Sequence, residues 1–272
     1  MEGCLDRPPD PLPTRVDSLP DLPDAYHGAL DAGLAEIGVA LSSDARATID
    51  GHIRLLLAWN AAINLTAIRD PAEIAIRHVV DSLTALRVLE ARDVSWVLDL
   101  GSGGGFPGLP LLATLPWGRG VLVESVGKKA RFLETVVSAT GMQDIVTVRA
   151  VRAEDLVAAG GAPQGAAVLA RAVASLGELI ELALPLLGPG GSLVAWKDVR
   201  AVSDGGELDG ARRAIAAIDP GARMNAVPAV PDEAGAAVDA LRDHRLVIVT
   251  RSGAPIARTW PRDPAARKRR PW

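Results

Sequence analysis

The chain has 272 residues, 49% of them hydrophobic, which is enough for one large α/β domain with extensions or for two small domains. Its single cysteine, Cys4, excludes a disulfide framework and a cysteine-based zinc site, and no metal site is expected. The net charge of −4 is unevenly distributed, because residues 258–272 hold six basic residues against one acidic residue. Only this C-terminal segment indicates contact with nucleic acid.

The sequence shows no feature of a membrane or secreted protein. No apolar run reaches the roughly 18 residues that a membrane-spanning helix needs. The first residues carry aspartate and proline where a signal peptide has its apolar core. We therefore expect a cytoplasmic protein, and because nothing in the sequence requires an oligomer, we expect a monomer.

In chain order, the first predicted segment is a proline-rich extension over residues 1–25, which lacks hydrophobic periodicity and is expected to be disordered. An N-terminal helical cap is expected over residues 26–92. Residues 42–44 offer an N-cap for its first predicted helix, and Asp70-Pro71 opens a second helix with proline in the first turn.

Residues 93–257 are predicted to form the main domain, because short apolar strands alternate there with helices. This spacing is typical of βαβ units and predicts a doubly wound, Rossmann-like α/β fold with a mostly parallel sheet. A late strand is expected at the sheet edge, and residues 258–272 are expected to form a basic C-terminal tail. The predicted strands cover 94–100, 119–124, 144–150, 166–172, 192–197 and 244–250, and the predicted helices begin at Pro107 or cover 126–140, 175–187 and 207–218.

A glycine-rich loop follows the first predicted strand, with five glycines among residues 101–108. Glycines between a strand and a helix let the backbone turn tightly and approach a ligand closely, so this loop is predicted to be a binding site. Gly103, Gly105 and Gly108 match G-x-G-x-x-G, and Glu124 lies at the spacing of a ribose-binding acid. An NAD-dependent oxidoreductase is therefore one interpretation.

The aspartate before the loop favours a different cofactor. A carboxylate at Asp99 would repel a pyrophosphate at the neighbouring helix N-terminus. S-adenosylmethionine has no phosphate and carries an ammonium and a sulfonium, which an acid at this position would attract. Glu124 would then accept hydrogen bonds from the ribose hydroxyls of this cofactor.

A second block of residues before the loop makes the pattern more specific. From about residue 30 to 258, the chain resembles the bacterial small-subunit ribosomal RNA guanine-N7 methyltransferase G family, also called glucose-inhibited division protein B. Generic methyltransferases lack the first two of the matching runs. These runs are WNAAINLTAIRDP (59–71), IRHVVDS (76–82), VLDLGSGGGFPGLPL (97–111), LVESVGKKARFL (122–133), VRAEDL (151–156), ARAVASL (170–176) and AWK (195–197).

The resemblance implies a class I S-adenosylmethionine-dependent methyltransferase that methylates N7 of a guanine in 16S rRNA. It places cofactor contacts at Gly101, Phe106, Ala153, Glu154 and Arg171, with Glu124 at the ribose. Arg171 also ends the fourth predicted strand, where ligands bind in open α/β sheets. We expect Arg171 to border both the cofactor and the incoming base and to act by positioning.

The chemistry of guanine N7 agrees with what the sequence lacks. This nitrogen has an exposed lone pair, so catalysis can rest on alignment and on the exclusion of water, without a general base. The predicted domain contains no cysteine for covalent pyrimidine methylation. No Asn/Asp-Pro-Pro-Tyr motif for adenine amines follows the fourth predicted strand.

The expected partner is 16S rRNA, either free or within the 30S subunit or an assembly intermediate. His78 is favoured as a structural hydrogen-bonding residue, with RNA or cofactor-side positioning as the alternative. A non-catalytic rRNA-binding assembly factor is the second alternative to the methyltransferase. The candidate RNA-binding residues are Arg77, His78, Lys197, Arg267, Lys268, Arg269 and Arg270.

Overall fold

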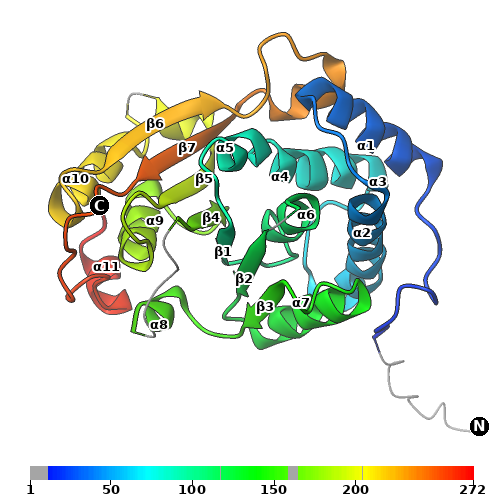
Figure 1. Ribbon diagram of the computed structural model, residues 1–272, viewed down its shortest axis with the longest axis horizontal. Coiled ribbons are helices and arrows are strands. Elements are labelled where there is room, and N and C mark those ends of the chain that lie inside the picture. Colours follow the sequence, from blue (N-terminus) through cyan, green and yellow to red (C-terminus); the bar gives the residue numbers. More distant parts are fainter. Residues whose placement is uncertain (1–11, 117, 159–164, 204) are drawn as a thin grey trace, which may run out of the picture.

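The computed structural model describes residues 12–116, 118–158, 165–203 and 205–272, and a seven-stranded sheet forms its centre (Figure 1). The strand order is β3-β2-β1-β4-β5-β7-β6, in which β7 runs antiparallel to both of its neighbours. The strands are β1 (Trp96–Leu100), β2 (Arg119–Val123), β3 (Val146–Arg149), β4 (Ala167–Arg171), β5 (Ser192–Asp198), β6 (Arg223–Pro228) and β7 (His244–Thr250).

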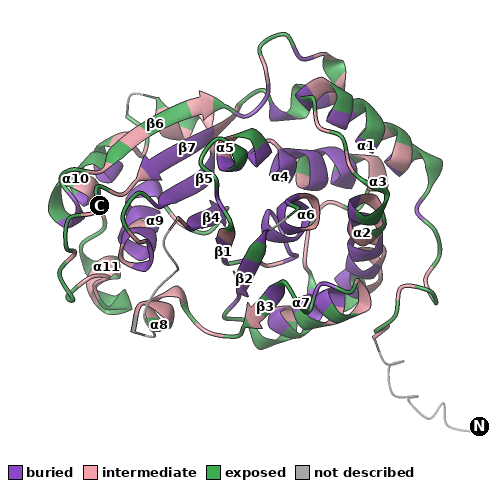
Figure 2. Ribbon diagram, viewed as in Figure 1, coloured by how far each residue is buried: buried purple, intermediate pink, exposed green. Residues whose placement is uncertain are grey.

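Helices cover both faces of this sheet, because the apolar strands alternate their side chains between two buried layers (Figure 2). In β1, Val97 packs with the N-terminal helices, whereas Leu98 packs with the helices of the opposite face. The first layer contains α6 (Gly108–Thr114) and α7 (Gly127–Ala139), and the second contains α9 (Leu176–Ala183) and α10 (Leu208–Ile218). The doubly wound, mostly parallel sheet predicted from the sequence is confirmed.

The N-terminal helices pack against the first layer. The Ser42 hydroxyl accepts the Ala45 amide at 3.1 Å, and the Asp70 carboxylate accepts the Glu73 amide at 2.9 Å, so both predicted helix starts are formed. The predicted helix that begins at Pro71 contains a π-helical stretch, Ala75–Val80, which the hydrophobic periodicity of the sequence did not predict. The helices are α1 (Asp24–Ile37), α2 (Ser43–Ile63), α3 (Pro71–Ile74), α4 (Asp81–Leu83) and α5 (Leu86–Glu90).

Two expectations about the ends of the fold need correction. Strand β7 does not close the sheet, because β6 pairs with it on the outside. All of β6 is exposed or half-buried, so it carries no buried apolar run from which to predict it. The extension 1–25 was expected to be disordered, but Leu22 is buried in the core and the Trp59 indole donates to the Pro13 carbonyl at 2.7 Å. Residues 1–11 lie outside the described part.

Among the helices described, none combines the length and hydrophobicity that crossing a bilayer requires.

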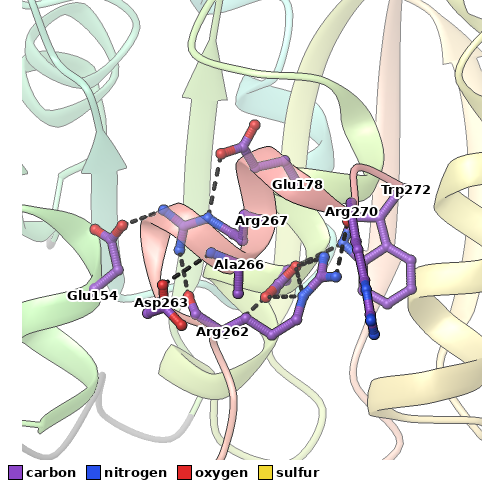
Figure 3. A network of polar contacts seen from close by, with 9 residues as sticks. Glu154, Glu178, Arg262, Asp263, Ala266, Arg267, Arg270 and Trp272 are labelled. Carbon is purple, nitrogen blue, oxygen red and sulfur yellow. Dashed lines mark hydrogen bonds and ion pairs between the residues drawn. The ribbon is translucent and has the colours of Figure 1, made fainter.

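The basic C-terminal segment is docked on α9 through a buried ion pair (Figure 3). The Glu181 side chain is fully buried, and the Arg262 guanidinium contacts both of its oxygens at 2.6–3.1 Å. The Trp272 indole donates to the same carboxylate at 2.7 Å, and its ring lies 4.5 Å from the Arg262 guanidinium carbon. A short helix, α11 (Pro264–Arg269), lies between Arg262 and Trp272 in the chain.

Substitution of Arg262 tests this anchor. Arg262→Ala should lower the free energy of unfolding by about 3–5 kcal/mol, because the buried Glu181 carboxylate loses its charged partner. The double variant Arg262→Ala/Glu181→Leu should recover most of this loss, because no charge then stays buried. Urea unfolding followed by circular dichroism measures both variants, with Arg269→Ala as the surface control. Equal stability of Arg262→Ala and the wild type would contradict the assignment.

Candidate active site

Two cavities lie at the carboxyl ends of the central strands and share Gly101 in their walls. The smaller, about 170 Å³, is lined by Val123 at the end of β2, by Glu154 of α8 (Ala153–Ala158) and by Arg267 of α11. The larger, about 620 Å³, is lined by residues of the N-terminal helices and of β4, β5 and β7. A position beyond the strand ends, where β1 and β4 diverge, is where open α/β sheets bind ligands.

The glycine loop separates these cavities and needs its glycines for steric reasons. Gly101, Gly103 and Gly105 have φ values of +70°, +54° and +91°. A Cβ atom on Gly101 would lie 2.8 Å from the Val173 side chain, and one on Gly105 would lie 2.4 Å from Leu109. The backbone therefore passes closer to its neighbours than any other residue would allow.

Glu124 lies against this loop, as the spacing predicted. One carboxylate oxygen accepts the Gly103 amide at 3.0 Å, and the other accepts the Val126 amide at 2.8 Å. Each oxygen of a carboxylate can accept two hydrogen bonds, so both retain capacity for hydroxyl donors. The side chain thus joins the end of β2 to the loop, and its neighbours Val123 and Ser125 line the smaller cavity.

Asp99 lies behind the loop, not in the cavity where it was expected to meet the cofactor. It is fully buried, and its carboxylate accepts the Gly108 amide at the start of α6 at 3.1 Å. Burial raises the pKa of Asp99 to about 6. Strand alternation explains the difference, because the side chain of residue 99 projects toward the face that α6 covers.

His52 of α2 supports the same loop and was not among the predicted site residues. It is buried, and its Nε2 donates to the Gly104 carbonyl at 2.7 Å. Its ring lies 4.7 Å from that of Phe106, which follows the glycines. The packing of α2 on α6 brings these residues together across 52 positions, a contact that no local motif encodes.

A charged network forms the wall of the larger cavity. The buried Asp81 carboxylate accepts from Arg171 at 2.7 Å and pairs with His244 Nδ1 at 2.8 Å. The hydrogen bond to Asp81 raises the pKa of His244. Arg171 therefore lies where predicted, at the end of β4, but Asp81 and His244 are site residues that the sequence did not identify.

His78 and Phe106 form the adjoining part of this wall. Their rings stack with centroids 4.6 Å apart, and the Arg171 guanidinium lies 5.4 Å from the Phe106 centroid. His78 Nε2 is 2.7 Å from the Thr66 hydroxyl, and burial lowers the pKa of His78 to about 4. The Thr66 contact agrees with the structural role that the sequence favoured for His78, and the lowered pKa favours its neutral form.

The candidate RNA-binding residues fall into two groups. Lys197 binds Glu207 at 2.8 Å and the Ala174 carbonyl at 2.7 Å, and Arg267 is paired with Glu154 and Glu178, so their charges are used within the chain. We correct the expectation that these two meet phosphates. The exposed group consists of Arg77, Lys268, Arg269 and Arg270.

The sheet order, the antiparallel β7 and the glycine loop with Glu124 at the end of β2 define a class I methyltransferase fold. The family model described as rRNA small subunit methyltransferase G matches residues 46–215, so the chain belongs to this family.

Named relatives agree with this family assignment, and solved structures agree with the fold. A ribosomal RNA small subunit methyltransferase G of Sorangium cellulosum is 41% identical over 72% of this chain and 80% of its own length. That of an Anaeromyxobacter strain is 39% identical over 63% and 78%. The fold is similar to cofactor-bound Rv0187 from MTB, with TM-score 0.52 at 22% identity over 75% of this chain and 91% of that one. The Bacillus cereus O-methyltransferase in complex with SAH gives 0.51 at 19% identity over 80% and 95%.

The support of the loop by His52 predicts a pH dependence. Burial lowers the pKa of His52 to about 4 from its ordinary value of 6.5, so the unfolded chain binds a proton there between these pH values and the folded chain does not. The contribution of His52 to stability is therefore complete above pH 6.5 and declines as the pH falls toward 4, by about 3 kcal/mol in total.

The variant His52→Gln provides the measurement, because glutamine can donate to the Gly104 carbonyl but does not titrate in this range. Urea unfolding between pH 4.5 and 7.5 should show a smaller loss of stability for the variant than for the wild type. Identical pH profiles of the two proteins would show that His52 does not titrate as the structure requires.

Proposed function

We propose that this protein is an S-adenosylmethionine-dependent methyltransferase that methylates N7 of a guanine in 16S rRNA. The observation that carries the proposal is the meeting of the two cavities at Gly101. One has the features of a nucleoside site, and the other is lined by an aromatic ring and an arginine held at the strand ends. Family membership supports rRNA of the small subunit as the substrate.

The residues of the smaller cavity fit the cofactor. Glu124, which lies between the lining residues Val123 and Ser125, retains acceptor capacity for two ribose hydroxyls, and Gly101 forms part of the cavity wall. Phe106, Gly101 and Gly103 line the larger cavity, where the methionine end of the cofactor would meet the target base. Gly105, at φ +91° and against Leu109, shapes the loop from behind. Ala153 and Glu154 would flank the adenine.

A dinucleotide fits this site less well than S-adenosylmethionine does. Pyrophosphates bind the free amides at a helix N-terminus. Here the Gly108 amide at the start of α6 already donates to the buried Asp99 carboxylate. A second anion would have to replace this bond beside an existing carboxyl group, so the NAD interpretation is disfavoured.

When bound, the cofactor supplies a methyl group already activated on sulfonium. Guanine N7 needs no deprotonation before it attacks, so the task of the chain is to align the base and exclude water. Arg171 presents guanidinium donors of the kind that bind guanine O6, and Asp81 fixes their direction. His78, with its lowered pKa, adds no charge beside the electrophile.

The exposed basic residues define a second element of the proposal. Arg77 stands at the rim of the larger cavity, and Lys268, Arg269 and Arg270 are exposed on and beside α11. We assign these four to rRNA phosphates, whether the substrate is free 16S rRNA, the 30S subunit or an assembly intermediate. A monomer in the cytoplasm is sufficient for this reaction.

Mass mapping of 16S rRNA and 30S subunits after incubation with labelled cofactor tests the function. We expect one guanine to gain one methyl group, and Arg171→Ala to lower the rate on the order of 100-fold through lost positioning. Arg119→Ala, an exposed residue on β2, is the control and should keep the wild-type rate. Unmodified rRNA despite bound cofactor would favour the assembly-factor alternative, and binding of NAD without S-adenosylhomocysteine would favour an oxidoreductase.

A further inference from the structure

The C-terminal segment reaches the smaller cavity from outside the part of the chain that the family model matches. The match ends at residue 215, whereas Arg267 of α11 lies in the cavity wall together with Glu154. The side chain of Arg267 is only 9% exposed, although it belongs to a strongly basic segment. Its burial shows that this charge is directed into the protein.

Arg267 joins two helices across the cavity. Its guanidinium binds the Glu154 carboxylate of α8 and lies 3.4 Å from that of Glu178 on α9. Its third contact is a hydrogen bond of 3.1 Å to the Arg262 carbonyl. Burial, the largest single effect, acts to raise the pKa of Glu154, but the hydrogen bond and the charge of Arg267, together with a backbone hydrogen bond and Arg152, outweigh it and lower this pKa. The Glu154 carboxylate is therefore ionised at neutral pH.

The segment that carries Arg267 is fixed independently of this contact. Arg262 is held by the buried Glu181, and Trp272 packs on α9 and α10 at Gly177 and Gly210. A Cβ on Gly177 would lie 2.5 Å from that of Trp272, so the glycine is what admits the ring. Figure 3 shows Arg267 between Glu154 and Glu178, with the Arg262 and Trp272 anchor beside it.

We propose that Arg267 is a positioning residue for the adenosine half of the cofactor site, holding Glu154 and the first turn of α8 against the bound nucleoside. The inference rests on the proposed cofactor. The basic segment would then have two roles, cofactor-site support by its inward-facing side chain and RNA contact by its outward-facing side chains. Arg267 faces inward to the cofactor wall, whereas its neighbours Lys268 and Arg269 face outward.

Titration calorimetry with S-adenosylhomocysteine tests the proposal. Arg267→Ala should weaken binding on the order of tenfold, because the charge-assisted hydrogen bond that holds Glu154 in the cavity wall is lost. Arg258→Ala removes the same charge from an exposed position of the same basic segment and should bind as the wild type does. Arg267→Lys should be intermediate, because one ammonium group cannot replace a planar guanidinium that reaches two carboxylates.

Kinetics separate positioning from a general loss of structure. Arg267→Ala should raise KM for S-adenosylmethionine, with little change in kcat or in KM for rRNA. Wild-type affinity for S-adenosylhomocysteine in either Arg267 variant would overturn the proposal, and Arg267→Lys keeps the test decisive if the alanine variant does not fold. A lower salt dependence of rRNA binding with unchanged cofactor affinity would assign Arg267 to RNA and also overturn it. Failure of the wild type itself to bind the cofactor would instead contradict the proposed function.

Discussion

The Asp81 carboxylate connects the N-terminal helices to the three strands that form the larger cavity. Its two oxygens bind Arg171 of β4 and His244 of β7, while the Asp81 carbonyl accepts the Trp196 indole of β5 at 2.9 Å. The Asp81 side chain is 2% exposed, so the loss of either partner would leave a buried carboxylate without its full set of contacts. The same contacts that fix the helical cap on the sheet therefore also orient the proposed base-binding arginine.

A second contact between the cap and the sheet domain fixes the cofactor side. His52 of α2 binds the Gly104 carbonyl, and the Phe106 ring lies between His52 and His78. The glycine loop is thus supported by the N-terminal helices as well as by Glu124. The loop borders both cavities, so the positions of the cofactor and of the base depend on the same packing. A reaction that relies on alignment and not on a general base requires such a shared support.

The sequence predicted those parts of the structure that local patterns encode. Apolar runs identified six of the strands, and the glycines with Glu124 identified the loop and the acid beside it. Strand β6 was missed because its side chains are exposed or half-buried, so it lacks the buried apolar run from which the other strands were predicted. The sequence placed Asp99 correctly at the end of the first strand, but it did not show that its side chain lies on the face of β1 that α6 covers.

The remaining errors concern side chains whose role depends on distant partners. Asp81 and His244 are 163 positions apart, and neither belongs to a motif that reveals their contact. Arg267 and Lys197 were assigned to RNA because basic residues are usually solvated, yet Glu154 and Glu207 bind them inside the fold. Sequence gives the sign of a charge, whereas only the fold decides whether that charge meets solvent or a carboxylate.

The most direct measurement of the coupling between cap and site is the single-turnover methylation rate of Asp81→Asn at saturating cofactor. Asparagine keeps the shape of the side chain but removes the charge that holds Arg171 and His244. We predict a rate at least about tenfold below the wild type, with affinity for S-adenosylhomocysteine nearly unchanged, because the lost contact orients the base side of the site. A wild-type rate in a folded Asp81→Asn protein would contradict the central role of this carboxylate.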